Sequence, residues 1–430
     1  MRDLLEKYDR AVPRYTSYPT APHFCADTSQ DDHRARLGAL PEGQGVSLYV
    51  HIPFCRHLCF YCGCNTQVVD REEPIARYLR AVAGEIALVA SALGRRQKVT
   101  HIHFGGGTPS FAPTSALASL LETIAARFTL ADGLEVAMEM DPRILTAEKA
   151  ADLAGLGVTR ASFGVQDFQD DVQRAVNRIQ PFDLVRAGVD CLRGSGIAGI
   201  NFDMIYGLPL QTVEKIRDNM HKLSLLSPDR VALFAYAHVP WFKEHQKKLE
   251  AYPLPDAALR LAMAEAARED LIAAGFMPIG IDHFSRPQDD LAVAWRQRRL
   301  RRNFQGYTTD AEKILIGFGQ TSISSYHTSY VQNTDGNREY RESIARGEFP
   351  IVKSRTLTDE DIARRAVIES IMCYGEADVA DPDLRQSAWP LLLPLAADGL
   401  VLLEGQSVKI TERGRPFTRL ATSAFDAYLN

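Results

Sequence analysis

HIPFCRHLCFYCGCN, residues 51–65, is the most informative stretch of the sequence. It follows an apolar run and places Cys55, Cys59 and Cys62 at the spacing CxxxCxxC, with Cys64 two residues further on. Four of the seven cysteines therefore fall within one short loop, and the other three are scattered. This is not the pattern of a disulfide framework in a chain of 430 residues, so the clustered thiols indicate a metal site.

The number of clustered cysteines limits the kind of metal site. A structural zinc site takes four ligands, usually from two separated CxxC pairs, and the chain has no second pair. A ferredoxin-type cluster also takes four thiolates, but Cys64 is awkwardly close to Cys62 for both to bind one cube. Three thiolates on a four-iron cube would leave one iron open to the amino and carboxylate groups of a small molecule, a role that the backbone end of methionine fits. The zinc and structural-cluster interpretations remain open alternatives.

The region from Val46 to His238 alternates short apolar runs with amphipathic stretches. The six runs are VSLYVHIPF, VTHIHFGGGTPS, LEVAMEMDP, RASFGVQDF, GINFDMIYGLP and RVALFAYAH. This alternation predicts a parallel sheet, and the polar and glycine-rich ends of the runs place the chemistry on one rim. Six units instead of eight predict an incomplete barrel that is open on one side. The turn GGGTPS lets the backbone approach a ligand closely, but it lacks the pattern of a phosphate-binding loop; a plain tight turn is the alternative.

The chain beyond His238 changes character. It contains a helical stretch, a loop-rich stretch from Asp282 to about Tyr330, and a last block from about Leu357. That block begins with a helix-capping Thr-x-x-Asp pattern and continues as helix, hairpin and helix, which resembles a winged-helix unit. Such units often bind DNA, but few basic residues lie on the hairpin, so we expect a packing or substrate-covering role.

Composition limits the class of protein. The sequence is 46% apolar and 24% charged, which supports a folded core and excludes a disordered chain. Lys and Arg number 49 against 54 Asp and Glu, so we expect no nucleic-acid or membrane partner. The start, MRDLLEKYDRAVPRYTSYPT, lacks the apolar segment of a signal peptide, and no apolar run is long enough to span a bilayer. These features predict a soluble, cytoplasmic protein.

Nine long stretches follow one another along nearly the whole chain: RYTSYPTAPHF, LYVHIPFCRHLCFYCGCN, FGGGTPS, EMDPR, SFGVQDF with VNRIQP, NFDMIYGLPLQT, YAHVPW, IDHFSRPQDDLA and RNFQGYTT. Together they resemble the oxygen-independent coproporphyrinogen III oxidases (coproporphyrinogen dehydrogenases), which are radical S-adenosylmethionine (SAM) enzymes. The resemblance implies an α/β fold, a three-quarter (β/α)6 barrel with an N-terminal extension and a smaller, mainly helical, winged-helix-like C-terminal domain. We expect an N-terminal extension that covers the active site at 1–45, a barrel core at 46–240, a barrel extension with substrate-covering loops at 241–355 and the C-terminal domain at 356–430.

The resemblance also implies the reaction and its cofactors. Two propionates of coproporphyrinogen III would be oxidatively decarboxylated to vinyl groups by a 5'-deoxyadenosyl radical derived from SAM, giving protoporphyrinogen IX in haem biosynthesis. The implied cofactors are a [4Fe-4S] cluster and two SAM molecules. The implied partners are the substrate and a low-potential electron donor such as flavodoxin or ferredoxin, and we expect a monomer.

Site residues follow from the same resemblance, motif by motif. The cluster ligands would be Cys55, Cys59 and Cys62. The first SAM would contact Tyr49, Gly106, Glu139 and Ile323. The second SAM would contact Tyr61, Gly107, Thr108, Gln166, Arg178, Asp203 and Ala237. The residues expected nearest the reaction are Cys64, His51 and Tyr49.

These residues also have structural alternatives. Glu139 and Asp203 stand at strand ends, where a carboxylate can simply cap the next helix, and Arg178 can belong to a surface ion pair. His51 can be a core histidine. IGFGQTSIS departs from many relatives by carrying Gln320 and Ser322, which could alter the adenosine pocket slightly.

The substrate's four propionates call for cationic partners. WRQRRLRRNFQGYTT offers five arginines, of which at least three are expected on a solvated face: Arg296, Arg298, Arg299, Arg301 and Arg302. We favour Arg302 and the N-terminal Arg14. A haem chaperone and a porphyrin-modifying radical SAM methyltransferase remain alternatives; Gly63, Cys64 and Asn65 favour the oxidase over the chaperone, which usually carries Asp-Phe there.

Overall fold

The computed structural model describes residues 2–8 and 10–429, which form two compact units. The barrel unit consists of Cys25–Pro255 and Glu312–Ser354. The composite unit consists of Met1–Phe24, Asp256–Ala311 and Arg355–Asn430. The expected segment 241–355 contributes to both units.

The six apolar runs all form strands of one sheet in the barrel unit. They are β1 (Gly45–Ile52), β4 (Lys98–Gly106), β5 (Thr129–Met140), β6 (Arg160–Gln166), β7 (Gly199–Tyr206) and β8 (Arg230–Ala235). Each pairs in parallel with the next in this order. The predicted strands and their parallel order are confirmed.

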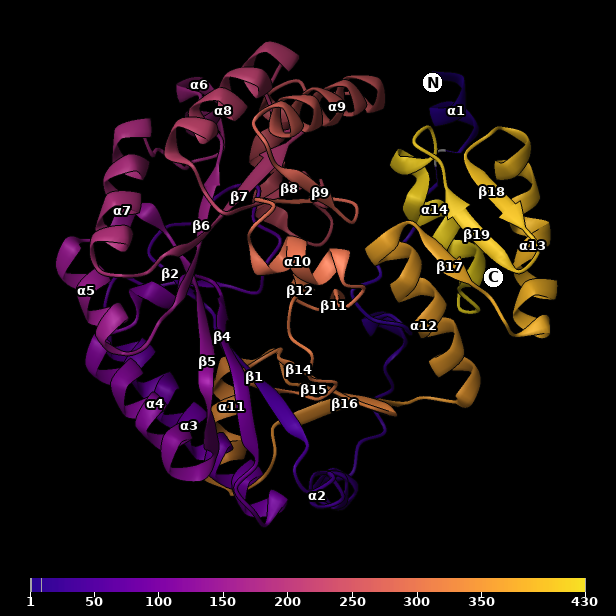
Figure 1. Ribbon diagram of the computed structural model, residues 1–430. Coiled ribbons are helices and arrows are strands. Elements are labelled where there is room, and N and C mark those ends of the chain that lie inside the picture. Colours follow the sequence, from indigo (N-terminus) through magenta and orange to yellow (C-terminus); the bar gives the residue numbers. More distant parts are fainter. Residues whose placement is uncertain (1, 9, 430) are drawn as a thin grey trace. The chain divides into compact units, whose positions relative to one another are not determined.

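Helices follow the strands because amphipathic stretches separate the apolar runs. They are α3 (Glu73–Leu93), α4 (Thr114–Arg127), α5 (Ala147–Gly155), α6 (Asp170–Ala175), α7 (Phe182–Gly194) and α8 (Val213–Leu226). Figure 1 shows α3, α4, α5 and α7 along the outer side of the strands. Helix α3 buries one apolar stripe that includes Ile75, Leu79, Val82 and Ile86, as its sequence spacing requires. The sheet curves as a partial barrel, which confirms the predicted fold class.

The prediction of a loop-rich stretch from Asp282 to about Tyr330 is wrong. In the barrel unit this part of the chain and the residues after it add β13 (Leu315–Phe318), β14 (Ile323–Tyr326), β15 (Ser329–Asn333) and β16 (Ile351–Thr356) beside β1. Strand β13 is parallel to β1, and β14 is antiparallel to β13. These strands are too short to show a clear alternation in sequence, and pairing with neighbouring strands stabilises them, beginning with β13 on β1.

The remaining elements of the barrel unit are short or lie outside the sheet. They are α2 (Gln30–Gly38), β2 (Phe54–Cys55), β3 (Gln67–Val68) and α11 (Asn337–Ala345). Strands β2 and β3 pair in parallel and so bring together the two ends of the cysteine loop.

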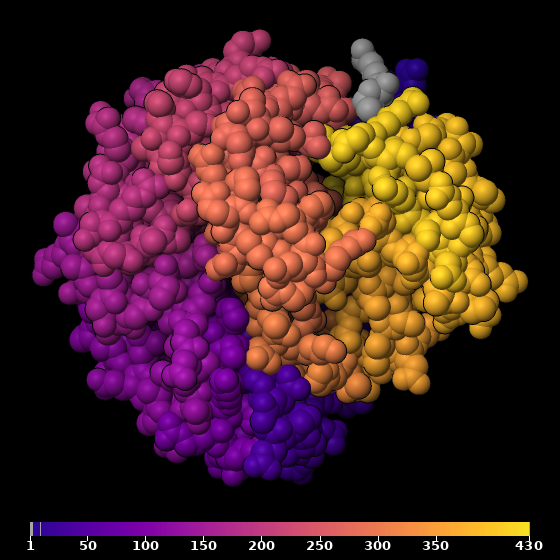
Figure 2. Space-filling view, viewed as in Figure 1, coloured from indigo at the N-terminus to yellow at the C-terminus, as the bar shows by residue number. Residues whose placement is uncertain are grey.

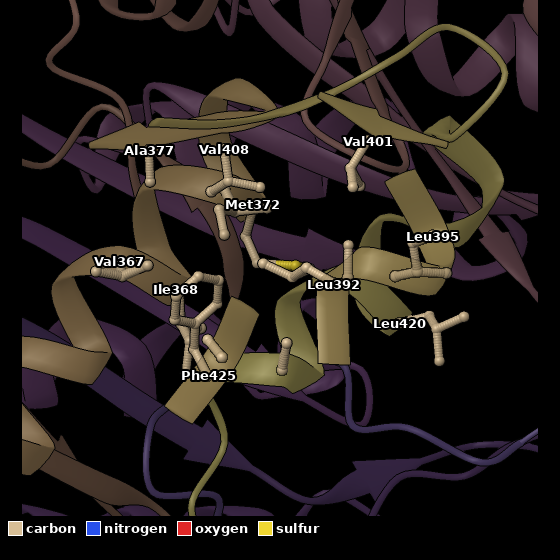
Figure 3. Close-up of a cluster of buried hydrophobic side chains, with 14 of the residues drawn as sticks. Val367, Ile368, Met372, Ala377, Leu392, Leu395, Val401, Val408, Leu420 and Phe425 are labelled. Carbon is tan, nitrogen blue, oxygen red and sulfur yellow. The ribbon is translucent and has the colours of Figure 1, made fainter. Parts of the chain in front are cut away.

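The composite unit has its own apolar core, part of which Figure 3 shows. Its elements are α1 (Arg2–Lys7), α9 (Ala257–Ala273), β9 (Met277–Ile279), β10 (His283–Ser285), α10 (Asp290–Arg296), β11 (Arg301–Asn303), β12 (Gly306–Thr308), α12 (Asp359–Tyr374), β17 (Glu376–Asp378), α13 (Pro382–Ala397), β18 (Val401–Glu404), β19 (Ser407–Ile410) and α14 (Thr418–Thr422). Ile368, Met372, Leu392 and Phe425 meet in this core.

The last block has the predicted order of elements. Strand β17, between α12 and α13, was not predicted; it pairs with β19 of the predicted hairpin, so that β17, β19 and β18 form a small antiparallel sheet as in a winged-helix unit. The predicted cap is present, because the side chain of Thr358 accepts from the backbone of Asp361 and the side chain of Asp361 accepts from the backbone of Thr358. Residues near 300 pack against this block within the composite unit (Figure 2), where Trp295 Nε1 donates to the carbonyl oxygen of Cys373 at 3.1 Å.

No helix among residues 2–8 and 10–429 has the length and apolar character needed to cross a bilayer.

Candidate functional site

A cavity of about 240 Å³ opens at the carboxyl ends of the barrel strands, where the sequence places the chemistry. The cysteine loop after β1, the glycine turn after β4 and residues of β5, β6 and β7 line it. Twelve of the predicted residues contribute to its lining: Cys55, Cys59, Tyr61, Cys62, Cys64, Gly106, Gly107, Thr108, Glu139, Gln166, Arg178 and Asp203.

The other predicted residues lie elsewhere. Tyr49 and His51 stand on β1 and do not line the cavity, and the hydroxyl of Tyr49 is 3.0 Å from Nδ1 of His51. Ile323 begins β14 and Ala237 is exposed after β8; neither lines the cavity. Arg14 and Arg302 belong to the composite unit.

Hydrogen bonds from neighbouring segments hold the backbone of the cysteine loop. The side chain of Asn177 donates to the carbonyl oxygen of Leu58 at 2.8 Å, and Gln246 donates to that of Tyr61 at 3.0 Å. A ring nitrogen of His245 lies 2.8 Å from the carbonyl oxygen of Cys62. The loop is therefore fixed by elements far from it in sequence.

Two guanidinium groups surround the thiol of Cys59. Arg178 Nη1 lies 3.4 Å and Arg143 Nη2 lies 3.8 Å from its Sγ atom. Both arginines also bind Asp141, at 3.3 Å and 2.6 Å. Burial alone would raise the pKa of Asp141, but the guanidinium of Arg178 and the hydrogen bonds and charge of Arg143 hold it below its usual value. This pair of cations offers positive charge to an anionic group held at Cys59.

The other thiols have different surroundings. Burial raises the pKa of Cys55 to about 12, although the hydroxyl of Thr108 donates to its sulfur at 3.5 Å. A hydrogen bond from Cys64 lowers the pKa of Cys62 to about 6, and the same bond raises that of Cys64. Cys62 and Cys64 are thus adjacent in space as well as in sequence.

The glycine turn needs its glycines. Gly106 has φ of +119°, and a Cβ on Gly107 would lie 2.7 Å from the carbonyl oxygen of Phe54. Instead, the backbone N–H of Gly107 donates to the carbonyl oxygen of Ile52 at 2.9 Å, and that of Thr108 donates to Phe54 at 2.8 Å. The turn therefore packs directly on the start of the cysteine loop.

The structure excludes the alternative roles of the polar strand-end residues, which were a helix cap and a surface ion pair. Glu139 accepts from the backbone N–H of Gly106 at 2.9 Å and lies 3.5 Å from Nε2 of His103, so it caps no helix. Asp203 accepts from the hydroxyl of Ser162 at 3.0 Å, while Thr212 caps the following helix. The side chain of Arg178 is only 8% exposed, which excludes a surface ion pair.

Three thiols of the cysteine loop line one cavity, where they would jointly hold a cluster. Within the described part of the chain, no three His, Cys, Asp or Glu side chains converge as the ligands of a single metal ion would. Cys55, Cys59 and Cys62 instead share the wall of one cavity, with cationic and hydroxyl donors at their sulfur atoms. A polynuclear cluster of negative charge fits this donor set.

Several residues of the cavity lining were not predicted. They include Asp141, Arg143, Ser162 and Gly164. The motif EMDPR contains the first two and carried the resemblance, but only its Glu139 received a role. The charged residues Asp141 and Arg143 of this motif were the signal in the sequence that could have identified them as part of the site.

Comparisons with known proteins agree with this site. Residues 49–223 match the model of the radical SAM superfamily. The chain is 47% identical to the oxygen-independent coproporphyrinogen III oxidase of Bradyrhizobium diazoefficiens, covering 100% of this chain and 97% of that protein, and 40% identical to that of Paracoccus denitrificans over 98% and 95%. It is 35% identical to the solved coproporphyrinogen III oxidase of Escherichia coli, a radical SAM enzyme, with a TM-score of 0.93 over 100% of this chain and 99% of that one. The chain therefore belongs to the oxygen-independent coproporphyrinogen III oxidase family of the radical SAM superfamily.

Proposed function

We propose that this protein converts two propionate side chains of coproporphyrinogen III to vinyl groups without oxygen and so forms protoporphyrinogen IX. The observation that carries this function is the cavity at the strand ends, where three cysteines meet the glycine turn and the polar ends of β5, β6 and β7 in a chain that matches these oxidases along its whole length. Membership of the family favours this oxidoreductase activity over the chaperone and methyltransferase alternatives.

Residues of the cavity would hold the cofactors. Cys55, Cys59 and Cys62 would bind the cluster, and the glycine turn would bring backbone groups close to SAM. When bound, the [4Fe-4S] cluster and SAM supply the radical that removes hydrogen from a propionate side chain. Around them, Arg143 and Arg178 stabilise negative charge at Cys59, and Glu139 holds the glycine turn through the backbone N–H of Gly106.

Contacts with two SAM molecules are proposed in the same way. The first set comprises Tyr49, Gly106, Glu139 and Ile323. The second set comprises Tyr61, Gly107, Thr108, Gln166, Arg178, Asp203 and Ala237. Cys64, His51 and Tyr49 are proposed to act near the reacting atoms. The lining of the cavity supports most of this assignment, and Tyr49, His51, Ala237 and Ile323 are the members that it does not include.

Arg302 is the best supported substrate contact. Its Nε and Nη1 atoms are buried and have no hydrogen-bond partner among the described residues, while Nη2 donates to the carbonyl oxygen of Arg14 at 3.3 Å. By contrast, Arg298 pairs with Glu376, and Arg301 lies 3.5 Å from Glu369. Two buried guanidinium donors favour an anionic ligand, and a propionate of the substrate provides one.

The remaining features are proposals of the same kind. We expect a low-potential one-electron donor such as flavodoxin or ferredoxin, a monomeric enzyme and a cytoplasmic location. We also retain 1–45 as an N-terminal extension that covers the active site, 46–240 as the barrel core, 241–355 as a barrel extension with substrate-covering loops and 356–430 as the C-terminal domain. Strands β13, β14 and β15 within 241–355 belong to the barrel sheet.

The test is product analysis under anaerobic conditions. The protein is reconstituted with iron and sulfide, supplied with SAM, a low-potential reductant, an electron acceptor and coproporphyrinogen III, and the porphyrins are identified by mass spectrometry. We expect the loss of two carboxyl groups per macrocycle. Cleavage of SAM with unchanged substrate would contradict the proposal, and stoichiometric haem binding without oxidation would favour the chaperone.

A further inference from the structure

The two ends of the cysteine loop are joined through Gln320, in the turn between β13 and β14, by its side chain at one end and its backbone N–H at the other. Its amide nitrogen donates to Oδ1 of Asn65 at 3.1 Å. Its backbone N–H donates to the hydroxyl of Tyr78 at 2.8 Å, and this hydroxyl donates to the carbonyl oxygen of His51 at 2.9 Å. Nε2 of His51 lies 3.3 Å from the carbonyl oxygen of Asn65. These four residues, which we call the loop clasp, close the base of the loop that carries the cluster cysteines.

A buried carboxyl group anchors the turn that presents Gln320. Glu85 of α3 accepts from the backbone N–H of Gly319 at 2.8 Å, from the amide of Asn333 at 2.6 Å and from the hydroxyl of Tyr340 at 2.6 Å. The amide of Asn333 also donates to the carbonyl oxygen of Gly319 at 2.9 Å. Hydrogen bonds to both the N–H and the carbonyl oxygen of Gly319 therefore fix the turn from which the side chain of Gln320 extends.

Folding stability alone does not explain a glutamine at this position. Gln320 has no exposed surface, and its amide oxygen has no hydrogen-bond partner among the described residues. A buried acceptor without a partner destabilises the folded state, whereas an apolar side chain of the same size would not. The bond to Asn65 is the side chain's only hydrogen bond recorded in the described residues. This bond is therefore the one contribution that a glutamine makes here and an apolar residue would lose.

We propose that Gln320 is a positioning residue for the cluster, because its bond to Asn65 fixes the end of the loop next to Cys62 and Cys64. This inference depends on the proposed cluster site, but the clasp itself exists without the cluster. When the bond is lost, the loop opens more often and the thiols leave their common cavity wall. The fold as a whole is unaffected, since α3 and Glu85 still hold the turn.

The decisive variant is Gln320→Met, which keeps the volume and removes the amide. Hydrogen exchange of residues 53–66, measured by mass spectrometry on the cluster-free protein, should become about fivefold faster, because one hydrogen bond no longer opposes opening. The melting temperature should stay the same or rise, since the unsatisfied oxygen is gone. Gln332→Met, the same change on β15, is the matched control and should leave exchange of the loop unchanged.

A second variant tests the partner. Asn65→Ala should loosen the same segment to the same extent, and the double variant should exchange no faster than either single one. Asn65→Asp keeps an acceptor for Gln320 and should preserve protection. In the reconstituted protein, a chelator should remove iron about fivefold faster from Gln320→Met than from wild type.

Two results would overturn the proposal. One is unchanged exchange of residues 53–66 in Gln320→Met; the other is equal loosening by Gln332→Met. Failure of the proposed function has a different signature, because the wild-type protein would then take up no cluster, while exchange in the cluster-free protein would still report on the clasp.

Discussion

Arg178 Nη1 lies 3.4 Å from Sγ of Cys59, so one buried guanidinium joins the end of β6 to the cysteine loop. The same side chain donates through Nε to the carbonyl oxygen of Gly164 at 3.1 Å and to Gln180 at 2.9 Å. Its positive charge therefore lies where anionic sulfur is expected, at a position that several acceptors fix.

Replacement of Arg178 should weaken the barrel unit. Arg178→Gln leaves buried acceptors without a donor, so the free energy of unfolding should fall by about 2–3 kcal/mol. Denaturant unfolding of the cluster-free protein measures this change. Arg174→Gln, which removes an exposed ion pair with Asp170, is the control and should change it by less than about 0.5 kcal/mol. Equal stability of the two variants would show that Arg178 does not stabilise the barrel unit.

Serine variants of the four cysteines in the loop should differ in whether they keep the cluster. Cys55→Ser, Cys59→Ser and Cys62→Ser should each abolish the visible absorption of the reconstituted cluster and all cleavage of SAM. Cys64→Ser should keep the cluster and slow turnover of the substrate. Cys191→Ser, outside the loop, should behave as wild type. Loss of iron from Cys64→Ser would mean that the ligand set was misassigned.

Gly107 should tolerate no side chain. In Gly107→Ala the new Cβ would lie 2.7 Å from the carbonyl oxygen of Phe54, so either the turn or the start of the cysteine loop must move. We expect at least tenfold less cluster uptake per protein, measured by iron and sulfide analysis. Gly63→Ala is the control: Gly63 lies in the cysteine loop, its new Cβ would have nothing within 4 Å, and the variant should take up a full cluster. Normal uptake by Gly107→Ala would refute the steric argument.

Arg302 should affect binding of the substrate more than its conversion. Arg302→Gln removes the charge-assisted hydrogen bonds that we propose with a propionate, so KM for coproporphyrinogen III should rise about tenfold or more while kcat changes little. Arg299→Gln is the control, because Arg299 is bonded to Gln297 on the surface. An unchanged KM in Arg302→Gln would exclude Arg302 from the substrate site.

Glu85 should make stability depend on pH. Burial raises its pKa to about 7 from an ordinary 4.5, so the folded state keeps the proton over a range in which the unfolded state has lost it. The free energy of unfolding should therefore fall as pH rises from about 4.5 to about 7, by on the order of 3 kcal/mol. Burial also raises the pKa values of the tyrosines around it, Tyr78, Tyr326 and Tyr340, which stay neutral in this range.

Glu85→Gln provides the comparison for this pH dependence. The variant lacks the titrating group, so its unfolding free energy should vary less between these pH values. Denaturant titrations of the cluster-free protein at several pH values measure the difference. Equal slopes for the two proteins would show that Glu85 does not retain its proton on folding.

Local patterns determined much of this protein. The six apolar runs became six parallel strands, because each run carries its own periodicity and boundaries. The spacing of Cys55, Cys59 and Cys62 and the capping pattern at Thr358 are likewise short-range features. By contrast, β13, β14 and β15 could not be predicted, because short strands depend on their neighbours for stability.

Only the tertiary structure brought Cys59, Asp141, Arg143 and Arg178 together, since these residues come from three separate strand ends and loops. It also distinguished Arg302 from its neighbours by leaving two of its donors without a partner among the described residues, and it surrounded the buried Glu85 with three hydrogen-bond donors. The physical reason is the same in each case: whether a polar group has a partner depends on residues distant in sequence, and no local pattern records it.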